Sequence, residues 1–169
     1  ISSAKLEKIF WYLRNFQVEQ LTRIYDTLRR NDNDDYKSAN KFFLDLIGQV
    51  GTDESALFIL SLLHKDSNAA KKIIPELALN WIEPSDHVLS NVVNELLKRD
   101  DPIYIRALSI MIGHSSHEYK NYTEQLVEQL KQARSHEKQL TYLFALNNIF
   151  TENVIEKILP IALGTTDYL

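Results

Sequence analysis

Apolar residues recur at three- and four-residue steps along most of the chain, which is the period of one face of an α-helix. The first such segment places Leu6, Ile9, Phe10 and Leu13 on one face. The pattern predicts ten helices of about three turns each, joined by short turns that leave little room for a strand. They cover approximately residues 4–15, 18–30, 36–50, 53–65, 67–81, 88–99, 102–113, 121–134, 135–150 and 152–163.

Turn-forming and capping residues mark several of the predicted helix ends. Gly51 is placed to end the helix before it in a left-handed conformation, and the Thr52 hydroxyl can cap the helix that follows. Asp101 followed by Pro102 has the form of an N-cap with proline at the first helical position. Pro75 lies inside the segment 67–81, where a proline removes one backbone donor, so we expect a kink or a local break there.

Two internal similarities indicate a repeat. At an offset of 38 residues, Tyr104–Leu108 aligns with Tyr142–Leu146, and at an offset of 85, Lys72–Pro75 aligns with Lys157–Pro160. These offsets are close to one and two units of the HEAT-type period of about 40–47 residues. A lone helix pair cannot cover its own apolar face, so neighbouring pairs must stack. The sequence therefore predicts an all-α array of stacked antiparallel helix pairs in two layers.

The most apolar segments supply the expected core. We expect Leu60, Leu108 and Leu146 to be buried between the two layers. Trp11 and Trp81 have two interpretations, since exposed tryptophans often anchor a partner or a lipid. The core interpretation is favoured for both.

Composition agrees with a helical domain and excludes several functions. The chain is 44% hydrophobic and 25% charged, with four Gly and four Pro, which argues against disorder and against a turn-rich β-sandwich. It has no Cys, which excludes disulfides and thiolate sites. Its net charge of −4 opposes nucleic-acid binding, and its apolar runs are too short to span a membrane. Because it begins at Ile1 without a signal-peptide pattern, we expect a piece of a longer polypeptide.

Two clusters with metal-binding potential favour ordinary turns. A calcium loop starting at Asp32 would place Lys37 at the glycine position and Phe43 at the position of the bidentate glutamate, so a solvated turn is favoured. His114 and His117 have the spacing of two imidazoles on one turn, but they follow the expected end of a helix. The HExxH, GxSxG, P-loop and GxGxxG motifs are absent. We therefore predict no catalytic, metal or cofactor site.

One modification motif is present. Asn121-Tyr122-Thr123 is an N-glycosylation sequon at a predicted turn between helices, where a glycan would stay in solvent if the protein is secreted. Simple helix capping by these polar residues is the competing interpretation.

Several segments resemble one protein family. Phe43–Thr52 resembles the segment of large lipid transfer proteins in which an apolar helix ends in Val-Gly-Thr, and Arg106–Gly113 resembles their Ala-Leu-rich helix that ends in glycine. The segments Leu126–Leu130, Leu140–Asn147 and Ile158–Pro160 follow the order of their later helices. This family comprises vitellogenins, insect apolipophorins, apolipoprotein B and the microsomal triglyceride transfer protein. The resemblance covers about residues 13–163.

The resemblance implies that residues 1–169 are one helical-repeat domain, a two-layered right-handed superhelix, of a secreted lipid-transport protein. In such proteins this domain braces β-sheet domains that form the lipid cavity, so the partners would be those domains and, through them, lipid. Association of two copies is also expected, because an unfinished stack exposes apolar surface. The alternative is a HEAT-type adaptor, unrelated to lipid, that grips a peptide or a protein on its concave face.

Overall fold

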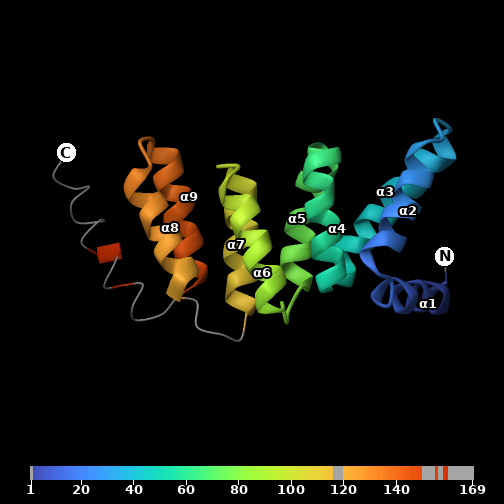
Figure 1. The fold of residues 1–169 in the computed structure, drawn as a ribbon, viewed down its shortest axis with the longest axis horizontal. Coiled ribbons are helices and arrows are strands. Elements are labelled where there is room, and N and C mark those ends of the chain that lie inside the picture. Colours follow the sequence, from blue (N-terminus) through green and yellow to red (C-terminus); the bar gives the residue numbers. More distant parts are fainter. Residues whose placement is uncertain (1, 116–119, 150–154, 156–157, 160–169) are drawn as a thin grey trace.

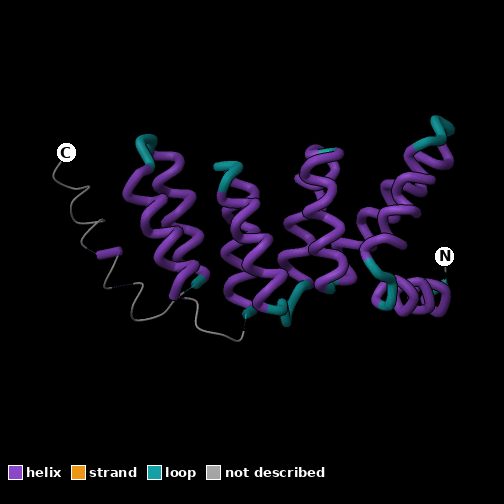
Figure 2. Tube along the Cα trace, viewed as in Figure 1, coloured by secondary structure: helices purple, strands orange, loops and turns teal. Residues whose placement is uncertain are grey.

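A computed structural model describes residues 2–115, 120–149, 155, 158 and 159. Of the predicted tenth helix, 152–163, only Ile155, Ile158 and Leu159 are described, and they are helical. The segment Lys157–Pro160 that carries the 85-residue similarity lies mostly outside the described residues. The described part contains helices and no strand, as Figures 1 and 2 show. The helices are α1 (Ser3–Arg14), α2 (Val18–Arg29), α3 (Asp34–Val50), α4 (Asp53–Lys65), α5 (Ser67–Asn80), α6 (Asp86–Leu97), α7 (Pro102–His114), α8 (Lys120–Gln132) and α9 (His136–Asn148).

The helices form a row of pairs. In Figure 1 the pairs α2–α3, α4–α5, α6–α7 and α8–α9 follow one another from the N-terminal to the C-terminal end of the stack. Each of α3, α5 and α7 also packs against the helix two further along the chain, and so do α2 and α4. We call α3, α5, α7 and α9 the odd layer, and α2, α4, α6 and α8 the even layer. The predicted all-α stack of helix pairs is therefore confirmed.

The two layers are not equally tight. Consecutive helices of the odd layer contact each other extensively. Consecutive helices of the even layer contact each other less, and α6 and α8 make at most marginal contact. The odd layer is therefore the more closely packed of the two layers.

The core lies between the layers and between successive pairs. Leu108 and Leu146 are fully buried, as predicted. Leu60 is only half-buried, so that prediction is wrong. Leu57 and Leu60 are spaced by three residues and share the face of α4 that the rest of the stack covers incompletely. Periodicity does not single out this face, because α4 is apolar on nearly every side.

Two glycines allow α3 to approach α5. A Cβ atom at Gly48 would lie 3.0 Å from Cβ of Glu76. Gly51 has φ of 59° and forms the C-cap of α3, and a Cβ atom there would lie 2.2 Å from the carbonyl oxygen of Asn80. The predicted role of Gly51 in helix termination is confirmed.

Pro75 does not break its helix. α5 continues from Ser67 to Asn80 with Pro75 exposed to solvent, so the predicted break is wrong. Buried side chains occur on both sides of the proline, at Ile74 and Leu77 among others. Their packing holds the helix together and offsets the one hydrogen bond that proline cannot donate.

Helix ends reveal a repeat that differs from the sequence similarity. The last residues of α5, α7 and α9 are Asn80, His114 and Asn148, which follow one another at a spacing of 34 residues. Tyr104 is the third residue of α7, whereas Tyr142 is the seventh residue of α9. The 38-residue offset therefore aligns these helices one turn out of register, although both tyrosines are buried.

Candidate interaction surface

The outward side of the odd layer carries exposed apolar side chains. We call this outward side of α3, α5, α7 and α9 the odd-layer face. Leu79 and Phe144 are the most exposed of the apolar residues there, at 59% and 60%. In the even layer, none of the described side chains that are large and apolar is exposed in this way. The exposed large apolar residues of the odd-layer face are Phe42, Leu79, Ile103, Leu140 and Phe144.

The repeat arranges the odd-layer face in rows that cross the helices. Lys72, Arg106 and Leu140 each stand eight residues before the last residue of their helix, so they lie at one level of α5, α7 and α9. Ile110 and Phe144 each stand four residues before the helix end and form a second row on α7 and α9. By the same spacing Glu76 of α5 belongs to the second row, so a partner that crosses the helices would meet apolar, basic and acidic groups side by side.

The first row, at the level of Leu140, carries two basic residues, Lys72 and Arg106. Lys72 and Arg106 form no ion pair with any residue that the structure describes. The neighbouring Lys71 differs, because its ammonium group donates a hydrogen bond to the Asp101 carboxylate at the next helix pair. Burial raises the pKa of Asp101, but this hydrogen bond and one from the amide of Ile103 outweigh burial and lower the pKa overall. Lys72 nevertheless acts electrostatically on Asp66, whose pKa it helps to lower.

Aspartates at the turns within pairs link each pair to the next. The Tyr25 hydroxyl donates to Asp66 at 3.0 Å, and the Tyr142 hydroxyl donates to Asp100 at 3.4 Å. Burial, and then the adjacent carboxylate, raise the pKa of Tyr25 and of Tyr142 to about 12. Both phenols therefore stay protonated and remain donors. These contacts hold neighbouring pairs together at the turns within the pairs.

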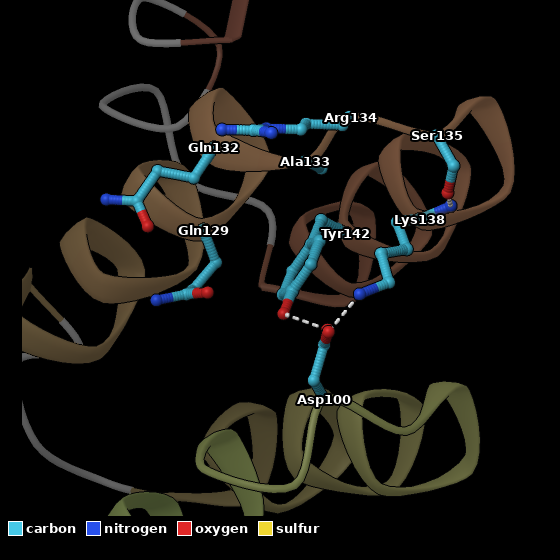
Figure 3. A pocket seen from close by; sticks show the side chains of 8 residues that line it. All are labelled: Asp100, Gln129, Gln132, Ala133, Arg134, Ser135, Lys138 and Tyr142. Carbon is cyan, nitrogen blue, oxygen red and sulfur yellow. Dashed lines mark hydrogen bonds and ion pairs between the residues drawn. The ribbon is translucent and has the colours of Figure 1, made fainter.

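A cavity of about 420 Å³ opens beside Asp100, where the even layer is loosest (Figure 3). The Asp100 backbone is left-handed, with φ of 48°. Its carboxylate accepts from both Lys138 and Tyr142, so it is engaged in structure and not free to act as a base. The cavity is lined by Asp100, Gln129, Gln132, Ala133, Arg134, Ser135, Lys138 and Tyr142.

The histidines and the acidic turn have local structural partners. Nδ1 of His114 lies 3.1 Å from the carbonyl oxygen of Trp81, and His117 lies outside the described residues. Asn33 caps α3 by accepting from the amide of Asp35, and Asp32 pairs with Lys37 at 2.7 Å. No group of three potential metal ligands occurs within the described ranges.

The two tryptophans have opposite environments. Trp81 is 1% exposed and donates its indole N–H to Asp53 at 2.9 Å, so the core interpretation is confirmed for it. Trp11 is 63% exposed, so the core interpretation is wrong for it. The helical pattern of α1 places Trp11 next to its apolar stripe, but α1 packs mainly against α3 and leaves its other side uncovered.

The sequon belongs to a helix and not to a turn. α8 begins at Lys120, so Asn121 lies in its first turn, which corrects the predicted position. The Asn121 side chain lies outside the described residues, and Thr123 is buried. Glycosylation of Asn121 stays a prediction.

Comparison with protein-family models, with curated proteins and with solved structures finds no match to this chain. In the part of the chain that the structure describes, no helix combines the length and the apolar character needed to cross a bilayer.

Proposed function

We propose that the chain is a non-enzymatic helical scaffold of a secreted lipid-transport protein, and that its odd-layer face docks a β-sheet domain of the same protein. The observation that carries the proposal is the segregation of exposed apolar side chains onto one layer. Contiguous apolar surface of this kind marks interaction sites, whereas scattered single residues need no explanation.

The composition of the face suits a docking surface. Leu79, Ile103 and Phe144 offer large apolar contact areas, and Lys72 and Arg106 lie among them without ion-pair partners in the described structure. Apolar anchors flanked by a few unpaired charges are common at interfaces, where the charges select the partner and its register.

The choice of a lipid carrier depends on the resemblance in sequence. The segment Phe43–Thr52 forms the end of α3, the left-handed Gly51 and the N-cap of α4. Gly51 has a physical reason to be glycine, because it contacts the backbone of Asn80 in the next pair.

Site-specific photo-crosslinking tests the proposal. A benzoyl-phenylalanine replaces Phe144 in the polypeptide that carries this sequence with its natural flanking segments. The matched control places the same group at Gln125, which is exposed on α8 of the even layer. We expect Phe144 to crosslink to a segment of the same polypeptide with the alternating pattern of a β-strand, and the control position to give no such product.

Lipid extraction completes the test. The longer polypeptide is expected to retain stoichiometric lipid, and the isolated chain of 169 residues to retain none, because its helices bury their apolar faces on one another. A crosslink from Phe144 to a separate polypeptide, with no lipid in either sample, would support the adaptor alternative and overturn the proposal.

A further inference from the structure

Helix α1 stands apart from the stack. In Figure 1 it runs across the direction of the other helices at the N-terminal end. It packs mainly against α3, and Leu13 is its one buried residue among those described. Ile9 and Phe10 are half-buried against the core. One side of α1 is therefore attached to the protein and the other is free.

The free side carries two aromatic rings. Trp11 is 63% exposed and Tyr12 is 45% exposed, and their rings make an edge-to-face contact with centroids 5.2 Å apart. Nζ of Lys8 lies 6.0 Å from the centroid of the Tyr12 ring. Trp and Tyr combine an apolar ring with a polar N–H or O–H group, which is why they gather at the boundary between lipid and water.

The charge of α1 is opposite to that of the whole chain. The helix contains Lys5, Lys8 and Arg14 against the single acid Glu7, whereas the chain has a net charge of −4. Arg14 lies on another side of α1, where it lines an open cavity together with Glu54 and other acids. Lys5 and Lys8 have no ion pair with any described residue.

The free side gathers these groups. Lys8 is three residues from Trp11 and four from Tyr12, and Glu7 is four from Trp11, spacings that place side chains next to one another on a helix. Lys5 is likewise exposed, three residues before Lys8. The arrangement is that of a helix lying on an interface, with aromatic rings at headgroup depth and ammonium groups beside phosphates.

We propose that α1 binds the surface of an anionic phospholipid layer through Trp11, Tyr12, Lys5 and Lys8. The positive charge of Lys5 and Lys8 is complementary to anionic headgroups. Trp11 and Tyr12 are suited to the boundary between lipid and water, and this contact does not require the partner to offer an apolar groove, as a protein with an acidic surface would have to. This contact is reversible and lies at the surface. It is distinct from lipid enclosed as cargo and does not depend on the proposed function.

Tryptophan fluorescence tests the proposal, because the chain has two tryptophans in opposite environments. The probe is vesicles of phosphatidylcholine with and without phosphatidylserine. We expect the emission to shift to the blue only with phosphatidylserine, and brominated phospholipid in the same vesicles to quench it. The Trp11→Phe variant, which keeps only the buried Trp81, is expected to show neither effect.

Charge variants provide the second measurement. Neutralising two ammonium groups near an anionic surface lowers the partition coefficient on the order of 30-fold, so K5Q/K8Q should show this loss in vesicle co-sedimentation. R23Q/K131Q removes the same net charge from exposed positions on α2 and α8 and should bind like the parent. No binding, equal binding to neutral vesicles, or equal losses in the two double variants would each overturn the proposal.

Discussion

Gly51 carries the chain from α3 into α4 at a point where the backbone of α5 leaves no room for a side chain. With φ of 59° and a virtual Cβ 2.2 Å from the Asn80 carbonyl oxygen, alanine meets both backbone strain and a clash with rigid atoms. We expect Gly51→Ala to lower the free energy of unfolding by about 2–4 kcal/mol, measured by urea denaturation.

Gly113 provides the matched control. It lies in α7 at an ordinary φ, and an added Cβ would be 3.4 Å from the Asn148 carbonyl oxygen, an ordinary contact. Gly113→Ala should leave stability unchanged or raise it by up to about 1 kcal/mol, because alanine favours helix. Equal losses in the two variants would contradict the assigned role of Gly51.

The leucines of the core differ in how fully they are enclosed. Leu108 and Leu146 are 0% exposed, and truncating either to alanine should cost about 2–5 kcal/mol. Leu60 is half-buried and should cost about half as much. Thermal melts of the three variants check this order. If Leu60→Ala lost as much stability as Leu108→Ala, Leu60 would have to be enclosed as fully as Leu108.

Two tyrosines predict how stability changes at high pH. Tyr25 and Tyr142 have folded pKa values of about 12, against an ordinary value of 10.0. Between these values the unfolded tyrosine has lost its proton while the folded one keeps it, so the unfolded state binds fewer protons and stability falls as pH rises. Below about pH 10 both states are protonated, and this pH dependence disappears.

The expected loss is roughly 2 kcal/mol for each tyrosine. The Y25F/Y142F variant is the measurement that isolates it, because phenylalanine keeps the ring and removes the titrating group. Its urea midpoint should start lower, since two hydrogen bonds are gone, but should fall less steeply above pH 10. A slope identical to that of the parent chain would exclude the tyrosines as the cause.

At the scale of the element, the pair α8–α9 is the most loosely attached part of the stack. It is held by the packing of α9 on α7 and by Asp100, which accepts from Lys138 and Tyr142, while α6 and α8 barely touch. We expect Asp100→Ala to speed amide hydrogen exchange in α8 and α9 and to leave α3–α5 unchanged. Asp45→Ala, on the exposed side of α3, is the control. Amide exchange that rises evenly along the chain would contradict the specific role of Asp100 in holding the pair α8–α9 to the stack.

The helices were largely predictable, because their periodicity and caps are local. Thr52 and Asp101 cap the helices that the sequence assigns to them. The continuity of α5 through Pro75 was not predictable in this way, since it depends on packing from neighbouring pairs. The exposure of Trp11 was not predictable either, because it depends on the absence of a neighbouring helix on that side of α1 among the described residues.

At the scale of the whole molecule, stacked pairs follow from short turns and apolar faces, and the sequence predicts them. The odd-layer face could not be predicted from the sequence. Periodicity identifies the main apolar stripe of each helix, but it does not show which other apolar residues stay exposed to solvent. Leu140 and Phe144 are spaced like core residues, yet Tyr142 and Leu146 are the ones buried beside them. The spacing of 34 residues that aligns the rows became visible only from the helix ends in the structure.

Hydroxyl-radical footprinting tests the central claim, which is that the odd-layer face docks another domain. It compares the isolated chain with the proposed longer polypeptide, and reads the oxidation of Phe42, Leu79 and Phe144 against the partly buried Leu57 and Leu60 of the even layer. The account predicts strong protection of the first three in the longer polypeptide and little change in the other two. Equal oxidation of Phe42, Leu79 and Phe144 in both samples would contradict it.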